Sequence, residues 1–322
     1  MVQRYELGTF PGPPDTVTAT LSGNNLAITV GANGKSISFT VTVSKPSGTG
    51  PFPAVIAYGG ASIPIPAGVA TINFNNDDFA AQSGMGSRGQ GKFYTLFGSS
   101  HSAGALTAWA WGVGRIVDAL EKTSGANIDV KRLGVTGCSR NGKGAIVAGA
   151  FEPRIALTIP QESGSGGSAS WRVSDAMKAA GQDTQTAKQI ITEQPWTGRP
   201  FDQYVSKITS LPHDHHFLMG MIAPRGLFML DNNILWLGPQ SSWTDAKAGH
   251  KIYEALGVPD NLGYSQIGSH THCVFPSNQQ AQLTSFYNKF LLNQPSASTA
   301  VMVSDTTYDE AKWVDWTVPT LT

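Results

Sequence analysis

The fold is decided by one stretch of the sequence, Arg132-Leu133-Gly134-Val135-Thr136-Gly137-Cys138-Ser139-Arg140-Asn141-Gly142. Its first five residues predict a strand, and the small residues over 142–150 predict a helix. A serine on a sharp turn between a strand and a helix lies above the carboxyl end of a sheet, where its hydroxyl is accessible. The stretch therefore indicates an α/β protein with Ser139 as a candidate nucleophile.

The turn matches the hydrolase pattern Gly-x-Ser-x-Gly only in part. Asn141 holds the second glycine position, and Gly142 follows one residue later. An ordinary turn with an N-capping serine has a similar composition. The motif by itself does not decide whether Ser139 is catalytic or only part of an ordinary turn.

Strands and helices alternate on both sides of this turn. Alternating polarity over 26–30 and 36–41, with Asn33-Gly34 between them, predicts an antiparallel hairpin. Further strands are expected over 54–58, 69–74, 155–159, 226–230 and 264–267, the last of these being the final strand, and helices over 103–122 and 280–292. Apolar runs closed by glycine are typical of strands buried on both faces of a parallel sheet. We expect one doubly wound α/β domain over residues 1–322, with antiparallel strands at its start.

The composition excludes several classes of protein. The 322 residues include 22 basic and 22 acidic groups, so the chain has no net charge to attract nucleic acid or an anionic membrane. It has no apolar run long enough to span a bilayer, and 8 Trp, 8 Tyr and 14 Phe argue against disorder. The opening Met1-Val2-Gln3-Arg4-Tyr5 lacks the features of a signal peptide. The low charge with abundant Gly, Ser and Thr nevertheless favours an extracellular protein.

A candidate base for Ser139 follows the expected strand over 264–267. His272 lies in Gly268-Ser269-His270-Thr271-His272-Cys273, and the chain order of serine, acid and histidine is that of α/β-hydrolases. Between Ser139 and His272 in the sequence, two carboxylates lie at the ends of expected strands. They are Glu162 and Asp231. Either could orient the imidazole, and their spacing does not decide which one does.

The two cysteines of the sequence are the neighbours of Ser139 and His272. Cys138 precedes Ser139, and Cys273 follows His272. If Ser139 and His272 lie within hydrogen-bond reach, their neighbours lie close to the separation of a disulfide. We therefore predict a Cys138–Cys273 disulfide that joins the nucleophile turn to the histidine loop.

Three motifs together resemble the fungal glucuronoyl esterases of carbohydrate esterase family 15. They are 137–143 (Gly-Cys-Ser-Arg-Asn-Gly-Lys), 160–164 (Pro-Gln-Glu-Ser-Gly) and 272–276 (His-Cys-Val-Phe-Pro). The resemblance extends over 53–316. It implies a secreted, cofactor-free and metal-free α/β-hydrolase, a three-layer sandwich around a mostly parallel sheet. Its substrate would be the ester between 4-O-methyl-glucuronic acid of glucuronoxylan and lignin alcohols.

The resemblance also implies roles for particular residues. The implied triad is Ser139 as nucleophile, His272 as base and Glu162 as acid, with Arg140 stabilising the oxyanion. The residues implied to bind the uronic sugar are Lys143, Gln185, Glu193 and Trp236. The sequence departs from the family in lacking its other cysteines, because Ser170 occupies one of their sites.

The sugar-binding residues also have ordinary structural readings. Lys143 would then be a solvated helix residue, Glu193 a surface charge, Gln185 a polar cap and Trp236 part of the core. The types of these residues do not distinguish the two readings without the resemblance.

The remaining histidines and tryptophans have simpler readings. His213-Asp214-His215-His216, with His270 and His272, contains zinc-ligand residue types, but consecutive positions rarely converge on one ion. We expect a hydrogen-bonded structural cluster there. Trp109 and Trp111 are expected in the core. His101 and His250, with no partner evident from spacing, are expected to be structural or surface groups.

The sequence thus predicts a serine esterase acting on glucuronoyl esters, most simply as a monomer. An esterase that removes acetyl groups from xylan and a catalytically silent carbohydrate-binding relative remain alternatives. Intact candidates for all three triad positions favour an enzyme.

Overall fold

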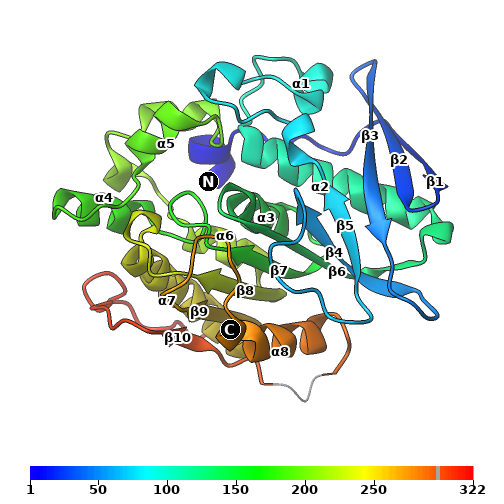
Figure 1. Ribbon diagram of the computed structural model, residues 1–322. Helices are drawn as coiled ribbons and strands as arrows, with labels where there is room; N and C mark the ends of the chain where they lie inside the picture. Colours follow the sequence, from blue (N-terminus) through cyan, green and yellow to red (C-terminus); the bar gives the residue numbers. More distant parts are fainter. Residues whose placement is uncertain (295–297, 322) are drawn as a thin grey trace.

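A ten-stranded sheet forms the centre of the molecule, in the order β1-β2-β3-β5-β4-β6-β7-β8-β9-β10 (Figure 1). The computed structural model describes residues 1–294 and 298–321. The strands are β1 Thr16–Ser22, β2 Asn25–Ala32, β3 Lys35–Ser44, β4 Phe52–Tyr58, β5 Ala70–Phe74, β6 Ile128–Cys138, β7 Ile155–Gln161, β8 Gly226–Asp231, β9 Leu262–Gln266 and β10 Met302–Ser304.

The first three strands are antiparallel, and β3 also pairs antiparallel with β5. Alternate side chains of β2 are buried and exposed, because one face covers the core and the other faces water. Asn33 and Gly34 connect β2 to β3 with φ of 55° and 70°, the left-handed conformation that a two-residue hairpin requires. The hairpin predicted from sequence is confirmed.

The other strand pairs, from β5 and β4 to β10, are parallel. Every residue of β4, β8 and β9 is buried. Such strands lie between two layers of helices, which explains the apolar sequence of β4 and of β8 up to Leu230.

Helices cover both faces of the sheet. They are α1 Lys92–Phe97, α2 Ala105–Lys122, α3 Arg140–Phe151, α4 Trp171–Ala179, α5 Ala187–Glu193, α6 His216–Ile222, α7 Pro239–Ala255 and α8 Gln280–Phe290. The larger core cluster includes α2, α3, α6 and α7, whereas α8 packs on the other face, where Phe286 stacks on Phe228 of β8. The three-layer α/β arrangement is therefore confirmed. Among the residues described, none of the helices is both long and apolar enough to cross a membrane.

The tryptophans of α2 belong to the core, as predicted. Trp109 and Trp111 are 0% and 1% exposed. They point to different neighbours, since Trp109 Nε1 donates to Ala80 O and Trp111 Nε1 to Gly12 O. The helix is buried on nearly all sides rather than on the single face that its periodicity suggested.

Parts of the fold differ from the prediction, since β10, α7 and the short helices α1, α4, α5 and α6 were not predicted. The strand ending at Gln266 is not the last, because β10 continues the sheet beyond it. The helix α7 was not expected, since its buried side includes Ser241, Ser242, Thr244 and Asp245 in place of an apolar stripe.

Candidate active site

The turn after β6 raises Ser139 above the carboxyl end of the sheet. Ser139 has φ of 59° and ψ of −124°, a strained conformation for a residue other than glycine. Its amide donates to Gln161 O at 2.9 Å, and its carbonyl accepts from Lys143 N at 3.0 Å. These bonds fix the serine between the end of β7 and the first turn of α3, as in a nucleophile elbow.

The displaced glycine of the motif has a steric reason. A Cβ on Gly142 would lie 2.6 Å from Gln161 O, so glycine is needed at this position for α3 to approach β7. Asn141 instead uses its side chain, accepting from Asn76 Nδ2 and donating to Tyr58 O, both at 3.1 Å. Position 141 thus links the turn to β4, and position 142 provides the close contact.

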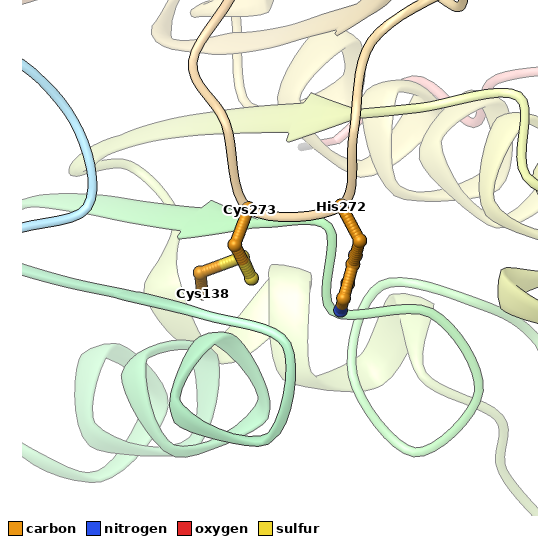
Figure 2. Close-up of side chains that lie close together, drawn as sticks. All are labelled: Cys138, His272 and Cys273. Atoms are coloured by element: carbon orange, nitrogen blue, oxygen red, sulfur yellow. A yellow bond between two sulfur atoms is a disulfide. The ribbon is translucent and has the colours of Figure 1, made fainter.

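The disulfide predicted from the two cysteine positions is present. Cys138 ends β6, Cys273 lies on the loop after β9, and their Cα atoms are 5.8 Å apart. Figure 2 shows His272 beside Cys273 on this loop. A ring nitrogen of His272 lies within 4.8 Å of both sulfur atoms. The disulfide therefore holds the histidine loop against the end of β6, next to Ser139.

Removing this disulfide is expected to lower both stability and turnover. It closes a segment of 135 residues, for which chain entropy predicts a stabilisation of about 5 kcal/mol at most. The variant Cys138→Ser/Cys273→Ser should unfold at a lower guanidinium concentration, and its kcat should fall about tenfold as His272 becomes less well placed. Equilibrium unfolding and steady-state kinetics measure both effects. An unchanged unfolding midpoint would contradict this role.

His272 and Glu162 form a hydrogen-bonded pair. His272 Nδ1 donates to Glu162 Oε2 at 2.7 Å, and the amide of Cys273 donates to the same oxygen at 3.1 Å. Glu162 is 1% exposed. Among the described residues, His272 Nε2 has no hydrogen-bond partner. The imidazole therefore has one nitrogen fixed by a carboxylate and the other available to a substrate or nucleophile.

Asp231, the other candidate acid, has different neighbours. Its Oδ2 accepts from Ser168 Oγ at 3.1 Å, and no hydrogen bond joins it to His272 in the described part of the chain. Burial, with a further contribution from the charge of Glu162, raises the pKa of Asp231 to about 7. The geometry favours Glu162 as the residue that orients His272.

Lys143 lies one turn after Ser139 and is only 4% exposed. Its Nζ donates to the carbonyl of Ser163 and lies 5.4 Å from the centre of the Trp196 ring. Burial lowers the pKa of Lys143 to about 7. A solvated helix residue would have none of these features.

The other three sugar-site candidates lie together. Gln185 Nε2 donates to Glu193 Oε2 at 2.8 Å, and the Gln185 amide donates to Trp236 O at 3.0 Å. Trp236 is 39% exposed and packs edge-on against His272, with ring centres 5.0 Å apart. This tryptophan is therefore a surface residue beside His272 and not part of the core.

Arg140 is exposed and begins α3 directly after Ser139. Its amide belongs to the first turn of the helix, where N–H groups have no partner within the helix. The described structure shows no hydrogen bond from its guanidinium. Both groups are thus available to an oxygen bound near Ser139.

The histidine-rich segment is a hydrogen-bonded cluster, as expected. His213 and His215 both bond to Glu6, at 2.9 and 2.7 Å, and His216 bonds to Asp245 at 3.3 Å. In the described chain, no hydrogen bond or ion pair joins this segment to His270 or His272. His270 instead bonds to Ile267 O at 2.7 Å, near the triad candidates.

The remaining two histidines agree only in part with the prediction. His101 Nδ1 accepts from the amide of Ala103. His250 has a partner that was not recognised, Glu254, at 3.0 Å. The pair is spaced i, i+4 on α7, and it was missed because that helix was not predicted.

Two residues of the site had not been identified from the sequence. Trp196 faces Lys143, and Asn232 Nδ2 lies 3.4 Å from Glu162 Oε2. Asn232 directly follows Asp231 at the end of β8, so its position was a usable signal. Nothing in the sequence places Trp196 beside Lys143, because they meet only in the folded chain.

Comparison with known proteins identifies close relatives. A family model described as fungal glucuronyl esterase matches residues 28–257. A 4-O-methyl-glucuronoyl methylesterase of Hypocrea jecorina is 63% identical over 322 residues, covering 100% of this chain and 70% of the relative. One from Thermothelomyces thermophilus is 60% identical over 318 residues, covering 98% and 80%.

Solved structures agree with these matches. The glucuronoyl esterase catalytic domain from Hypocrea jecorina has a TM-score of 0.98 at 63% identity, covering 100% of this chain and 89% of that one. A serine-to-alanine mutant from Sporotrichum thermophile, in complex with methyl 4-O-methyl-β-D-glucopyranuronate, has a TM-score of 0.96 at 59% identity, covering 98% and 86%.

Proposed function

Because the chain belongs to the fungal glucuronyl esterases, we propose that it hydrolyses esters of 4-O-methyl-glucuronic acid with Ser139, His272 and Glu162. The observation that carries this proposal is the 2.7 Å bond from His272 Nδ1 to Glu162. In the described part of the chain Nε2 has no hydrogen-bond partner, and the Cys138–Cys273 disulfide holds the His272 loop next to the strained Ser139 turn. Every group in this assignment lies at the carboxyl edge of one sheet, which supports a single catalytic domain.

The proposed reaction has two steps. His272 Nε2 accepts the proton of Ser139 Oγ as this oxygen attacks the ester carbonyl, and then gives the proton to the departing alcohol. Water attacks the resulting acyl-enzyme, again with His272 as base, and releases the uronic acid. Glu162 stabilises the imidazolium that forms in each step.

Arg140 is proposed to stabilise the oxyanion of both tetrahedral intermediates. Its amide and guanidinium would donate to the developing negative charge. Arg140→Ala is expected to lower kcat by about 10²- to 10³-fold with little change in KM, because the charge exists only near the transition state. Steady-state kinetics on methyl 4-O-methyl-glucuronate measure this. Arg140→Lys should recover little, since the lysine lacks the planar guanidinium, and wild-type kcat in Arg140→Ala would refute the role.

The sugar is proposed to bind beside the triad. Lys143, Gln185 and Glu193 supply donors and acceptors for its hydroxyl groups, and Trp236 supplies an apolar face. Lys143 is already held by the carbonyl of Ser163, and Gln185 by Glu193 and Trp236, so little ordering is needed on binding.

We infer that the natural substrate is the ester that links glucuronoxylan to lignin alcohols. The enzyme is further proposed to be a secreted monomer that needs no cofactor. The absence of net charge is consistent with an anionic polysaccharide substrate. A strongly negative enzyme would be repelled by such a polysaccharide, and a strongly positive one would bind it too tightly to dissociate quickly.

A comparison of substrates tests this function. Wild type should release alcohol from benzyl glucuronate and from methyl 4-O-methyl-glucuronate, and little acetate from acetylated xylan. Ser139→Ala serves as the blank for every substrate. Release of acetate with no cleavage of the glucuronate esters would favour an acetyl esterase, and binding without any hydrolysis would favour a silent carbohydrate-binding protein.

A further inference from the structure

A buried carboxylate, Glu6, lies outside the proposed sugar site, in the short helix Gln3–Leu7. Glu6 is 1% exposed. Its Oε1 accepts from His215 Nε2 at 2.7 Å and from Trp171 Nε1 at 3.1 Å, and its Oε2 bonds to His213 Nε2 at 2.9 Å. Burying a carboxylate to this extent costs free energy unless it is paired, so these hydrogen bonds are needed to stabilise its charge.

The hydrogen bonds of His215 require a charged imidazolium. Its Nε2 bonds to Glu6, and its Nδ1 lies 2.6 Å from the carbonyl of Gly167. Both partners are acceptors, and only the protonated ring donates from both nitrogens. Burial opposes this charge, but Glu6 raises the pKa of His215 to about 9.

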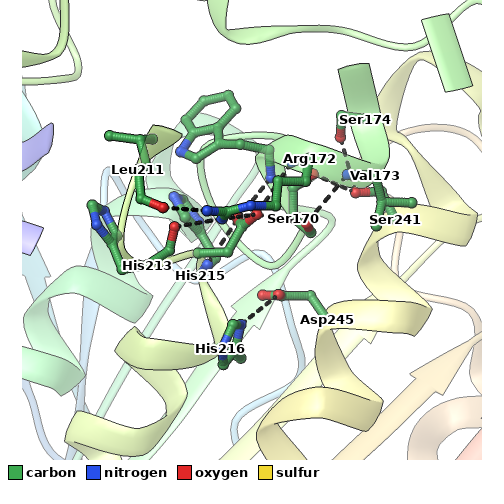
Figure 3. A network of polar contacts seen from close by, with 12 residues as sticks. Ser170, Arg172, Val173, Ser174, Leu211, His213, His215, His216, Ser241 and Asp245 are labelled. Carbon is green, nitrogen blue, oxygen red and sulfur yellow. Dashed lines mark hydrogen bonds and ion pairs between the residues drawn. The ribbon is translucent and has the colours of Figure 1, made fainter. Parts of the chain in front are cut away.

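Other carboxylates near His215 do not replace Glu6. Asp214 accepts from Ser170 Oγ at 2.8 Å and from Arg172 at 3.1 Å. Figure 3 shows Ser170 and Arg172 in this network, with His216 directed at Asp245. Asp245 bonds to His216. Glu6 is therefore the carboxylate that bonds directly to the His215 ring.

Gly167 belongs to a compact loop, residues 163–169, that begins directly after Glu162. Within it, the Gly167 amide donates to Gly164 O at 2.9 Å, and the Ser168 amide donates to Ser163 Oγ at 2.9 Å. A bond to Gly167 therefore restrains the whole loop.

The 163–169 loop contacts Lys143 of the proposed sugar site and the buried Asp231. The Ser163 carbonyl accepts from Lys143 Nζ, and Ser168 Oγ donates to Asp231. A Cβ on Gly166 would lie 3.5 Å from Lys143 Cδ and 3.2 Å from the Trp171 ring. The loop is thus packed between Lys143 and Trp171, whose Nε1 donates to Glu6.

We propose that Glu6 is a positioning residue for the sugar site: through protonated His215 it holds the 163–169 loop, and through that loop it holds Lys143. This inference rests on the proposed function for the role of Lys143. In Glu6→Gln the side-chain oxygen has to keep the Oε1 position, because an amide nitrogen there would face the N–H of Trp171. His215 then becomes neutral and donates from one nitrogen only, so its bond to residue 6 or its bond to Gly167 is lost.

The test compares two buried carboxylates. In Glu6→Gln, KM for methyl 4-O-methyl-glucuronate should rise about tenfold while kcat stays within about twofold, because the triad itself is untouched. Hydrogen exchange of the 163–169 amides should accelerate.

Glu152→Gln is the matched control. Glu152 is 5% exposed and pairs with Arg154, just after the C-terminal end of α3, whereas Ser139 lies at the N-terminal end of this helix. This control should lose stability without a change in KM or in loop exchange. Glu6→Asp, which keeps the charge, should restore part of the affinity.

Three outcomes would overturn the inference. They are an unchanged KM in Glu6→Gln, an equal rise in KM in Glu152→Gln, or unchanged exchange of the loop. A wild-type protein that leaves the glucuronate ester intact would instead refute the proposed function and the substrate half of this inference. Loop exchange would still decide whether Glu6 restrains the loop.

Discussion

Ser139→Ala is expected to lower kcat on methyl 4-O-methyl-glucuronate by about 10⁶-fold, and His272→Ala should cost about as much. The reason is that the two side chains act as one unit. Without the serine the base has no proton to accept, and without the base the hydroxyl is a poor nucleophile at neutral pH. The double variant should therefore be no slower than either single one.

Binding separates this prediction from a general loss of structure. Ser139→Ala should bind the methyl ester with ordinary affinity, since the proposed sugar contacts come from Lys143, Gln185, Glu193 and Trp236. Calorimetry on the variant measures this. Losses that add in the double variant would indicate that the two residues act independently and would contradict a shared role.

Local patterns predicted most of the sheet because its sequences agree with their surroundings. The apolar run of β4 is buried on both faces, and the alternation of β2 matches one wet face and one dry face. Helix α7 escaped prediction because Asp245, Ser241 and Ser242 are buried on it. Polar residues are stable in such positions only with partners from elsewhere in the chain, as when Ser241 Oγ donates to Ser170 O at 2.7 Å.

The candidate site was predictable where the chain itself brings residues together. Ser139 lies on a turn with a recognisable sequence, and the cysteines beside Ser139 and His272 form a disulfide that places one near the other. The surroundings of Lys143 were not predictable, since Trp196 and Ser163 reach it from distant segments.

The choice between the two acids also lay beyond the sequence. Glu162 follows β7 and Asp231 is the last residue of the neighbouring β8. The amide of Glu162 donates to Leu230 O in that strand. Both carboxylates therefore reach the same edge of the sheet. The path of the loop after β9 decides which of them meets His272, and this path depends on tertiary packing.

Glu162→Gln is expected to lower kcat by about 10⁴-fold, whereas Asp231→Asn should change it by less than about tenfold. Glu162 Oε2 accepts the Nδ1 proton of His272 at 2.7 Å, which leaves Nε2 free of a proton and able to act as base. A glutamine that turns its amide nitrogen toward Nδ1 loses the bond from the Cys273 amide and favours the tautomer protonated at Nε2, which cannot accept the proton of Ser139. It also removes the negative charge that stabilises the imidazolium.

Asp231→Asn is the matched control because both carboxylates are buried and lie at the ends of neighbouring strands. Burial raises the pKa of Asp231 to about 7, so the side chain is partly neutral near neutral pH and asparagine resembles its protonated form. The oxygen of asparagine can still accept from Ser168 Oγ, which keeps the 163–169 loop in place. Steady-state kinetics at pH 6 and pH 8 measure both variants against wild type. If Asp231→Asn lost as much activity as Glu162→Gln, the two carboxylates would share the role, and the 2.7 Å bond alone would not identify the catalytic acid.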